Sequence, residues 1–287
     1  MRLTKVSKRS IINKRPINNL FSYGEVSTGF GTIEAELNLS SSGIHKKDLK
    51  DPTLYLKLFQ DLAEEHSGQV GFPTSWFAVQ NIGWIITRWH MDIHTFPSMC
   101  STLVLKSWTA PNKRIQAFRS FTIGSREQPS MITACSNWLL LNQEKRRPAR
   151  LPRTLIESYG ISPETHDEEE LLKPVQTPSA ANFLDKTSFK PTEKDIDTNS
   201  HLNNLVYAYH SLSLAENHVP KNFSVKTLDI KYLKESRGDS EIDLFIYFSH
   251  SESKSKKKYI VTLNNSLNGE LLAQVELSYA VLSTSVK

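Results

Sequence analysis

The sequence predicts an α+β protein built from two similar units in tandem, each an antiparallel sheet wrapped around one long helix. The 287-residue chain holds only two long helix-periodic segments, one in each half. Each segment follows one strand candidate and precedes four others, with no second long helix. Asp92-Ile93 and Asp229-Ile230 also occupy matching places in the long strand after each helix. Because a sheet with a single helix buries one face against it, two such units would pack with their sheets joined.

The elements of the first unit follow from local patterns. Residues 32–39 alternate apolar and polar side chains, which is typical of a strand with one buried face. Asp51 and Pro52 indicate a helix start, because aspartate caps free N–H groups and proline fits the first turn. Apolar periodicity then predicts a helix over 53–69. Further strands are predicted at 83–96, 102–110, 115–123 and 131–141.

The second unit repeats this order. A strand is predicted at 183–190, and a polar loop leads from it into a helix at 202–217 that Pro220 closes. Further strands are predicted at 224–233, 241–250, 258–265 and 270–282. We therefore expect a basic, disordered leader at 1–30, a first domain at 31–143, a charged, proline-punctuated connector at 144–181, and a second domain at 182–287.

The charge distribution excludes several classes of protein. The first 20 residues hold six of the 35 Lys and Arg residues and no acid, so the rest carries 29 basic and 30 acidic residues. Because a nucleic-acid-binding core would be basic and a membrane span needs a long apolar run, we expect neither nucleic-acid binding nor stable membrane insertion. Cys100 and Cys135 form no metal spacing or disulfide framework, which indicates a reduced, cytoplasmic protein. The basic leader leaves organellar or plastid import open.

The densest polar stretch is residues 195–204, which carries two aspartates, three asparagines and one histidine directly before the second helix. Such groups are costly to bury unless they bond one another or take part in chemistry. In an extended approach to the helix, Asp197, Asn199 and His201 would point the same way. An acid, an amide and an imidazole suit hydrolysis of an acyl group, with a base for water and a donor for the oxyanion. The alternative is a capping network for the helix.

A second polar segment, residues 231–240, ends the strand expected to lie over the start of this helix, which places Glu235 and Ser236 near the loop. The first half offers only His45 at the corresponding place, so we expect its contribution to be shape. All five tryptophans lie in the first half. We expect most of them in the core and one or two in the wall of a pocket for a long apolar ligand.

Together these residues resemble the acyl-[acyl carrier protein] thioesterases of plants and bacteria, proteins with two hot-dog domains in tandem. The resemblance rests on residues 195–204 with Tyr207 and on residues 232–240 in the second half. In the first half it rests on residues 83–88 and 138–147. It extends from about residue 31 to the end of the chain.

The resemblance implies hydrolysis of the thioester between a fatty acyl chain and the carrier's phosphopantetheine, with Asp197, Asn199, His201 and Glu235 at the functional positions. In plant members a cysteine follows the glutamate, whereas this chain has Ser236. A serine without a base in contact is a poor nucleophile, so we favour direct attack by water. In this hypothesis Glu235 is the general base, Asn199 holds the water or the oxyanion, and Asp197 and His201 orient the carbonyl. Asp197 as the base is the alternative.

The implied partner is an acidic acyl carrier protein, so we expect a basic landing surface. The candidates are Arg146, Arg147, Arg150, Arg153, Lys254 and Lys256 to Lys258.

Two other functions fit the same fold, an acyl-CoA thioesterase and a non-hydrolytic acyl-binding protein. We expect no cofactor and no metal ion. Tandem domains already supply the pairing that single hot-dog domains obtain by dimerising, so monomer and homodimer are both compatible with the sequence.

Overall fold

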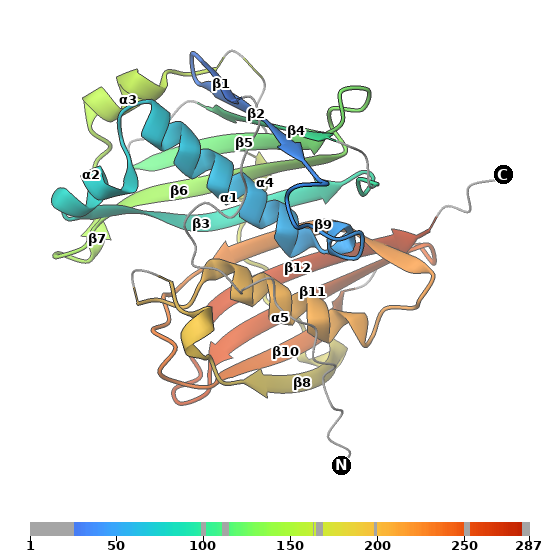
Figure 1. The fold of residues 1–287 in the computed structure, drawn as a ribbon. Helices are drawn as coiled ribbons and strands as arrows, with labels where there is room; N and C mark the ends of the chain where they lie inside the picture. Colours follow the sequence, from blue (N-terminus) through green and yellow to red (C-terminus); the bar gives the residue numbers. More distant parts are fainter. Residues whose placement is uncertain are drawn as a thin grey trace.

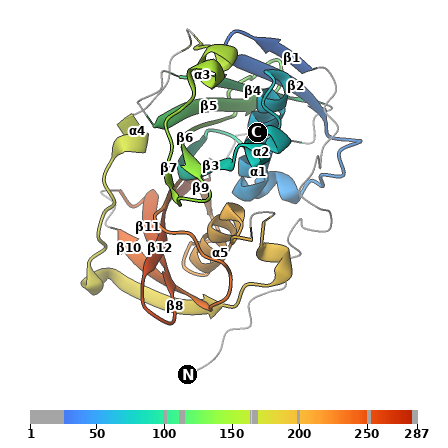
Figure 2. The same cartoon turned by 90° about the vertical axis from the view of Figure 1, so that its left-hand side faces the viewer.

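The computed structural model describes residues 26–98, 102–110, 115–162, 164, 169–197, 200–249 and 253–282. Within these ranges the strands form one continuous 12-stranded sheet. Two long helices, α1 (Pro52–Gln69) and α5 (Asn204–Glu216), lie next to each other across one face of this sheet (Figure 1). The short helix α4 (Glu169–Leu172) lies on the opposite face (Figure 2). None of the helices in these ranges combines the length and the apolar character that a bilayer crossing requires.

Strand pairing is antiparallel throughout the described sheet. The strands of the first half are β1 (Val26–Gly29), β2 (Thr32–Asn38), β3 (Ile82–Ile93), β4 (Thr102–Thr109), β5 (Gln116–Gly124), β6 (Ile132–Asn142) and the two-residue β7 (Arg147–Pro148). Those of the second half are β8 (Phe183–Phe189), β9 (Phe223–Tyr232), β10 (Ile242–Ser249), β11 (Lys256–Asn265) and β12 (Leu271–Val281).

The sheet topology contains an internal repeat. In space the strands run β2-β4-β5-β6-β3 in the first half, and the second half runs β8-β10-β11-β12-β9 when read from its own outer edge. The two half-sheets join where β3 pairs with β9, with Trp89 opposite Ile230. Each half therefore wraps its strands around one long helix, and the predicted α+β class with joined antiparallel sheets is confirmed.

The core forms where the apolar faces of the strands meet α1 and α5. On β2 the alternating residues Ile33, Ala35 and Leu37 are fully buried, as their period of two predicts. On α1, Phe59 packs against Trp89 and Phe121, with ring centroids 6.2 and 4.8 Å away. Burial of such large side chains is the main favourable term that holds each helix on its sheet.

The two long helices begin at polar caps. Asp51 accepts a hydrogen bond from the backbone N–H of Thr53 at 2.9 Å, and Pro52 is the first helical residue, as predicted for α1. Helix α5 begins at Asn204, two residues later than expected, because Leu202 forms an isolated antiparallel bridge with Ile196. Both starts face the seam between the two halves (Figure 1).

Several short elements differ from the sequence predictions. Val26–Gly29, which we expected within the leader, pair with β2 as strand β1, whereas residues 1–25 lie outside the described ranges. Helix α2 (Thr74–Val79) was not predicted; it follows Pro73 and buries Phe77. A helix of two turns or fewer shows too little apolar periodicity to be recognised in a sequence.

The expected connector contains regular structure. Helix α3 (Arg153–Tyr159) buries Leu155 in an apolar cluster with Phe77 and Leu140, and α4 buries Leu171. The segment is therefore attached to the first half rather than running free between the halves. The exact domain boundaries given above stay a prediction.

The joint between the two half-sheets carries a buried ion-pair cluster. Arg88 on β3 donates to both carboxylate oxygens of Asp229 on β9, Nε to Oδ1 at 3.1 Å and Nη2 to Oδ2 at 2.7 Å. His90 lies 3.2 Å from the same Oδ2 and 3.3 Å from Asp92. His90, Glu170 and Asp229 could also present three metal ligands within 4.8 Å of one another, but both oxygens of Asp229 already bind Arg88. The cluster is therefore explained as a structural joint.

We expect this joint to make stability depend on pH. Burial lowers the pKa of His90, but its hydrogen bonds to Asp229 and Asp92, with their negative charges, outweigh burial and raise the pKa from 6.5 to about 9. Since the folded-state pKa is the higher one, protonated His90 stabilises the fold fully below pH 6.5, and this contribution is lost as the pH rises to about 9. The loss is of the order of 3 kcal/mol. Across this pH range the free energy of unfolding, measured with denaturant, should fall less steeply for His90→Gln than for the native chain. Equal slopes would contradict the assignment.

Candidate active site

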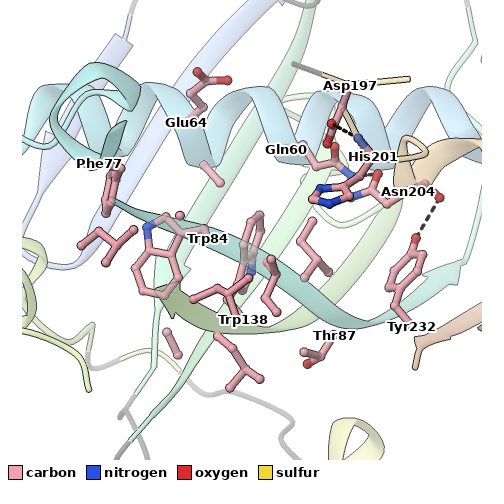
Figure 3. Close-up of a pocket in the computed structure, with 18 of the residues that line it drawn as sticks. Gln60, Glu64, Phe77, Trp84, Thr87, Trp138, Asp197, His201, Asn204 and Tyr232 are labelled. Atoms are coloured by element: carbon pink, nitrogen blue, oxygen red, sulfur yellow. Dashed lines mark hydrogen bonds between the residues drawn. The ribbon is translucent and has the colours of Figure 1, made fainter. Parts of the chain in front are cut away.

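The polar stretch before α5 folds into a closed turn. The backbone N–H of Asp197 donates to the carbonyl of His201 at 2.7 Å, and the N–H of His201 donates back to Asp197 Oδ1 at 3.0 Å. Ser200 adopts φ of 61°, a left-handed conformation that tightens the turn. The expected extended approach, with side chains alternating to one side, is therefore wrong. Asp197 and His201 are nevertheless brought together, by the turn instead of by alternation (Figure 3).

The cap of α5 is the first asparagine after His201 in the polar stretch. Asn203 is the N-cap, and its Oδ1 accepts from the N–H of Leu205 at 2.9 Å. Asp195 is buried and accepts from the backbone N–H and the hydroxyl of Thr192, both at 2.8 Å. Asn203 and Asp195 thus serve structural roles, while Asp197 accepts from His201. Thr198 and the predicted Asn199 lie outside the described residues.

Glu235 lies against the turn, as the sequence predicted. Its Oε2 is 3.6 Å from Nε2 of His201, and the same oxygen forms an ion pair with Nη2 of Arg146. The segment is held there by the N–H of Leu202, which donates to the carbonyl of Ser236 at 2.7 Å. Gly238 has φ of 71°, and a Cβ there would lie 2.3 Å from Cδ1 of Ile196. Only glycine permits this close approach.

Ser236 is close to this cluster but is engaged in its own turn. Its side-chain oxygen accepts from the N–H of Gly238 at 3.2 Å, and the residue is 6% exposed. Among the described residues, no imidazole or carboxylate hydrogen bonds to this hydroxyl. Activation of a serine nucleophile needs such a base in contact. The geometry around Ser236 therefore does not support a covalent role.

Two residues of the first half reach the cluster, and sequence reasoning did not place either of them there. Arg146 was expected only as part of a landing surface, yet it binds Glu235 from the turn between β6 and β7. Gln60 on α1 donates through Nε2 to Oδ1 of Asn204 at 2.9 Å, across the seam between the helices. These contacts join residues far apart in the chain, so no local pattern announces them.

The floor beneath the turn is aromatic. Tyr232 donates its hydroxyl to the carbonyl of Asn204 at 3.0 Å, and its ring packs edge-on against Tyr207 at 5.7 Å. Burial, followed by the nearby charge of Glu235, raises the pKa of the Tyr207 phenol far above its ordinary value. Burial also raises the pKa of the Tyr232 phenol well above its ordinary value. Both phenols therefore stay protonated at any working pH and can only support the site as neutral groups.

A cavity of about 1050 Å³ opens beside the cluster and extends into the first half. His201 and Glu235 line it at the seam, and Phe77, Trp84 and Trp138 line it farther in (Figure 3). Trp89, by contrast, is fully buried in the core. The prediction that one or two tryptophans form a pocket wall is thus confirmed for Trp84 and Trp138. The prediction that most of the five lie in the core is wrong, because only Trp89 is fully buried and the other four are partly exposed. The polar cluster and the largely apolar cavity form one continuous space.

Comparison with protein-family models matches the acyl-ACP thioesterase N-terminal domain to residues 42–159 and the acyl-ACP thioesterase C-terminal domain to residues 180–280, where ACP is the acyl carrier protein. The chain belongs to the acyl-ACP thioesterase family. It is 24% identical over 233 residues to the chloroplastic oleoyl-acyl carrier protein thioesterase of Coriandrum sativum, covering 76% of this chain and 62% of that protein. It is 23% identical over 203 residues to the chloroplastic oleoyl-acyl carrier protein thioesterase 2 of Arabidopsis thaliana, covering 65% of this chain and 54% of that protein. The chain thus spans only a little over half the length of these relatives.

Solved structures share the fold. The 12:0-ACP thioesterase from Umbellularia californica superposes with a TM-score of 0.76 at 17% identity, covering 88% of this chain and 94% of that one. An acyl-ACP thioesterase from Bacteroides thetaiotaomicron superposes with a TM-score of 0.70 at 17% identity, covering 87% of this chain and 98% of that one. At these identities the likeness concerns the fold, and it confirms the predicted hot-dog architecture.

Proposed function

We propose that this chain hydrolyses the thioester of fatty acyl-ACP and releases a free fatty acid and the carrier's thiol. The observation that carries the proposal is the position of the His201–Glu235 pair at the seam end of the 1050 Å³ cavity. A thioester carbonyl held at the pair would leave its acyl chain in the apolar part of the cavity and its carrier outside. Membership of the family supports the same substrate class.

In the proposed mechanism water attacks the thioester directly. Glu235 takes a proton from the water as its oxygen bonds to the carbonyl carbon, and Asn199 is assigned to the water or the oxyanion. Asp197 and His201 orient and polarise the carbonyl, and the carbon–sulfur bond then breaks to give the acid and a thiolate that is reprotonated. The 3.6 Å approach of His201 to Glu235 supports a shared role for these two groups. A positioned acid–base group contributes roughly 10²–10⁴ in rate.

Arg146 gives this mechanism a positioning residue from the other half of the chain. Its side chain is half-exposed and pairs with Glu235, whereas the next residue, Arg147, is exposed on β7 and forms no ion pair with a described residue. We expect Arg146→Gln to lower kcat by roughly tenfold with little change in KM, because Glu235 loses the partner that fixes its carboxylate. We expect Arg147→Gln to leave kcat unchanged and to affect only KM and its salt dependence. Equal kcat values for both variants would contradict the positioning role.

The function itself is tested by thiol release from acyl carriers of graded chain length. Hydrolysis of carrier-bound chains in preference to CoA-bound chains supports the proposal, and the reverse preference favours an acyl-CoA thioesterase. Tight acyl binding without thiol release would favour a non-hydrolytic acyl-binding protein.

We further propose a cytoplasmic location; the plant relatives are named as chloroplastic. A sedimentation experiment distinguishes the monomer from the homodimer.

A further inference from the structure

The far end of the cavity contains a cation. From the seam the cavity crosses β3 and β6 to β5, where residues of α3 and Thr109 on β4 also line it. Three strand spacings separate β9 from β5, which is about 14 Å. Arg119 on β5 lines the cavity in this region. A guanidinium is unexpected where the methyl end of a plain acyl chain would lie.

The contacts of Arg119 are all with neutral groups. Nη1 donates to Oγ of Ser107 and to Nδ1 of His66, both at 3.0 Å, and the guanidinium lies 5.4 Å from the ring centre of Tyr159. Arg119 is only 7% exposed. Burial, followed by the positive charge of Arg119, lowers the pKa of His66 to about 3, so this imidazole is uncharged.

No carboxylate within the described ranges pairs with Arg119, and its Nε and Nη2 donate to no described residue. A buried arginine without a counter-charge is costly, because its charge is removed from water and nothing neutralises it. Elsewhere in the protein these two donors bind a carboxylate: Nε and Nη2 of Arg88 donate to the two carboxylate oxygens of Asp229. Arg119 presents the same pair of donors beside a cavity rather than beside an acid.

We propose that Arg119 binds a carboxylate at the distal end of the acyl chain, so that the substrates of this chain include ω-carboxyacyl thioesters. A carboxylate would make two parallel, charge-assisted hydrogen bonds to Nε and Nη2, the geometry for which arginine is best suited. The apolar wall formed by Trp84 and Trp138 contacts the methylene groups between the two ends. The inference rests on the proposed use of the cavity for the acyl chain.

Binding of non-hydrolysable analogues tests the inference without requiring turnover. Pairs of pantetheine amides, in which nitrogen replaces the thioester sulfur, would carry acyl chains of equal length ending in a carboxylate or in a methyl group. Calorimetry on the native chain should show the carboxylate-ended analogue binding at least about tenfold more tightly at one chain length or more. A native chain that prefers the methyl-ended analogue at every length overturns the inference, whatever the behaviour of the variants.

Variants locate the preference. Arg119→Met should remove the advantage of the carboxylate-ended analogue, and Arg119→Lys should retain part of it because the charge remains. An advantage that survives Arg119→Met in a folded protein would also overturn the assignment. If the preference is present but no thioester is cleaved, the proposed hydrolysis fails and the binding site stands. If thioesters are cleaved without any preference, only the binding site fails.

Discussion

Replacing Glu235 with glutamine is expected to lower kcat/KM for acyl-ACP hydrolysis by roughly 10²–10⁴. The change keeps the shape of the side chain but removes the carboxylate that would accept the proton from water. Thiol release under single-turnover conditions measures the effect on the chemical step. Ser236→Ala is the matched control, because the side-chain oxygen of this neighbouring residue accepts a hydrogen bond from the N–H of Gly238. Loss of activity in Ser236→Ala with retention in Glu235→Gln would reverse the mechanism and indicate a covalent acyl-enzyme.

The same assay decides between the two carboxylates. Asp197 accepts from the backbone N–H of His201 through Oδ1, and an asparagine at this position offers the same acceptor. If Asp197 shapes the turn and orients the carbonyl without taking a proton, Asp197→Asn should therefore retain most of the activity. A loss as large as that expected for Glu235→Gln would instead identify Asp197 as the general base, the alternative that the sequence left open.

The fold could be predicted because its determinants are local. The burial of Ile33, Ala35 and Leu37 on one face of β2 follows directly from a period of two in the sequence. The cap of α1 follows from the Asp51-Pro52 pair. The same reasoning missed α2, because six residues supply less than two turns of periodicity.

The site could be predicted only in part, since it depends on contacts across the chain. Polar density identified Asp197, His201 and Glu235, and the structure brings these three together. The turn at Ser200 was missed because a positive φ at serine has no sequence signal. Arg146 and Gln60 were missed because their partners, Glu235 and Asn204, lie 89 and 144 residues away. The halves thus contribute to one site through pairings that the sequence order conceals.

His201→Ala is expected to lower kcat by roughly 10²–10³ with a smaller change in KM, because the imidazole is the polar group that faces both Glu235 and the cavity (Figure 3). The turn should survive the change, since His201 closes it with backbone N–H and carbonyl groups that alanine keeps. An unchanged melting temperature would therefore show that the loss is chemical. His45→Ala is the control, since His45 is exposed in the loop before α1, at the corresponding place in the first half. If both variants hydrolyse acyl-ACP like the native chain, the cluster before α5 is an elaborate turn, and the hydrolytic groups must be sought elsewhere along the cavity.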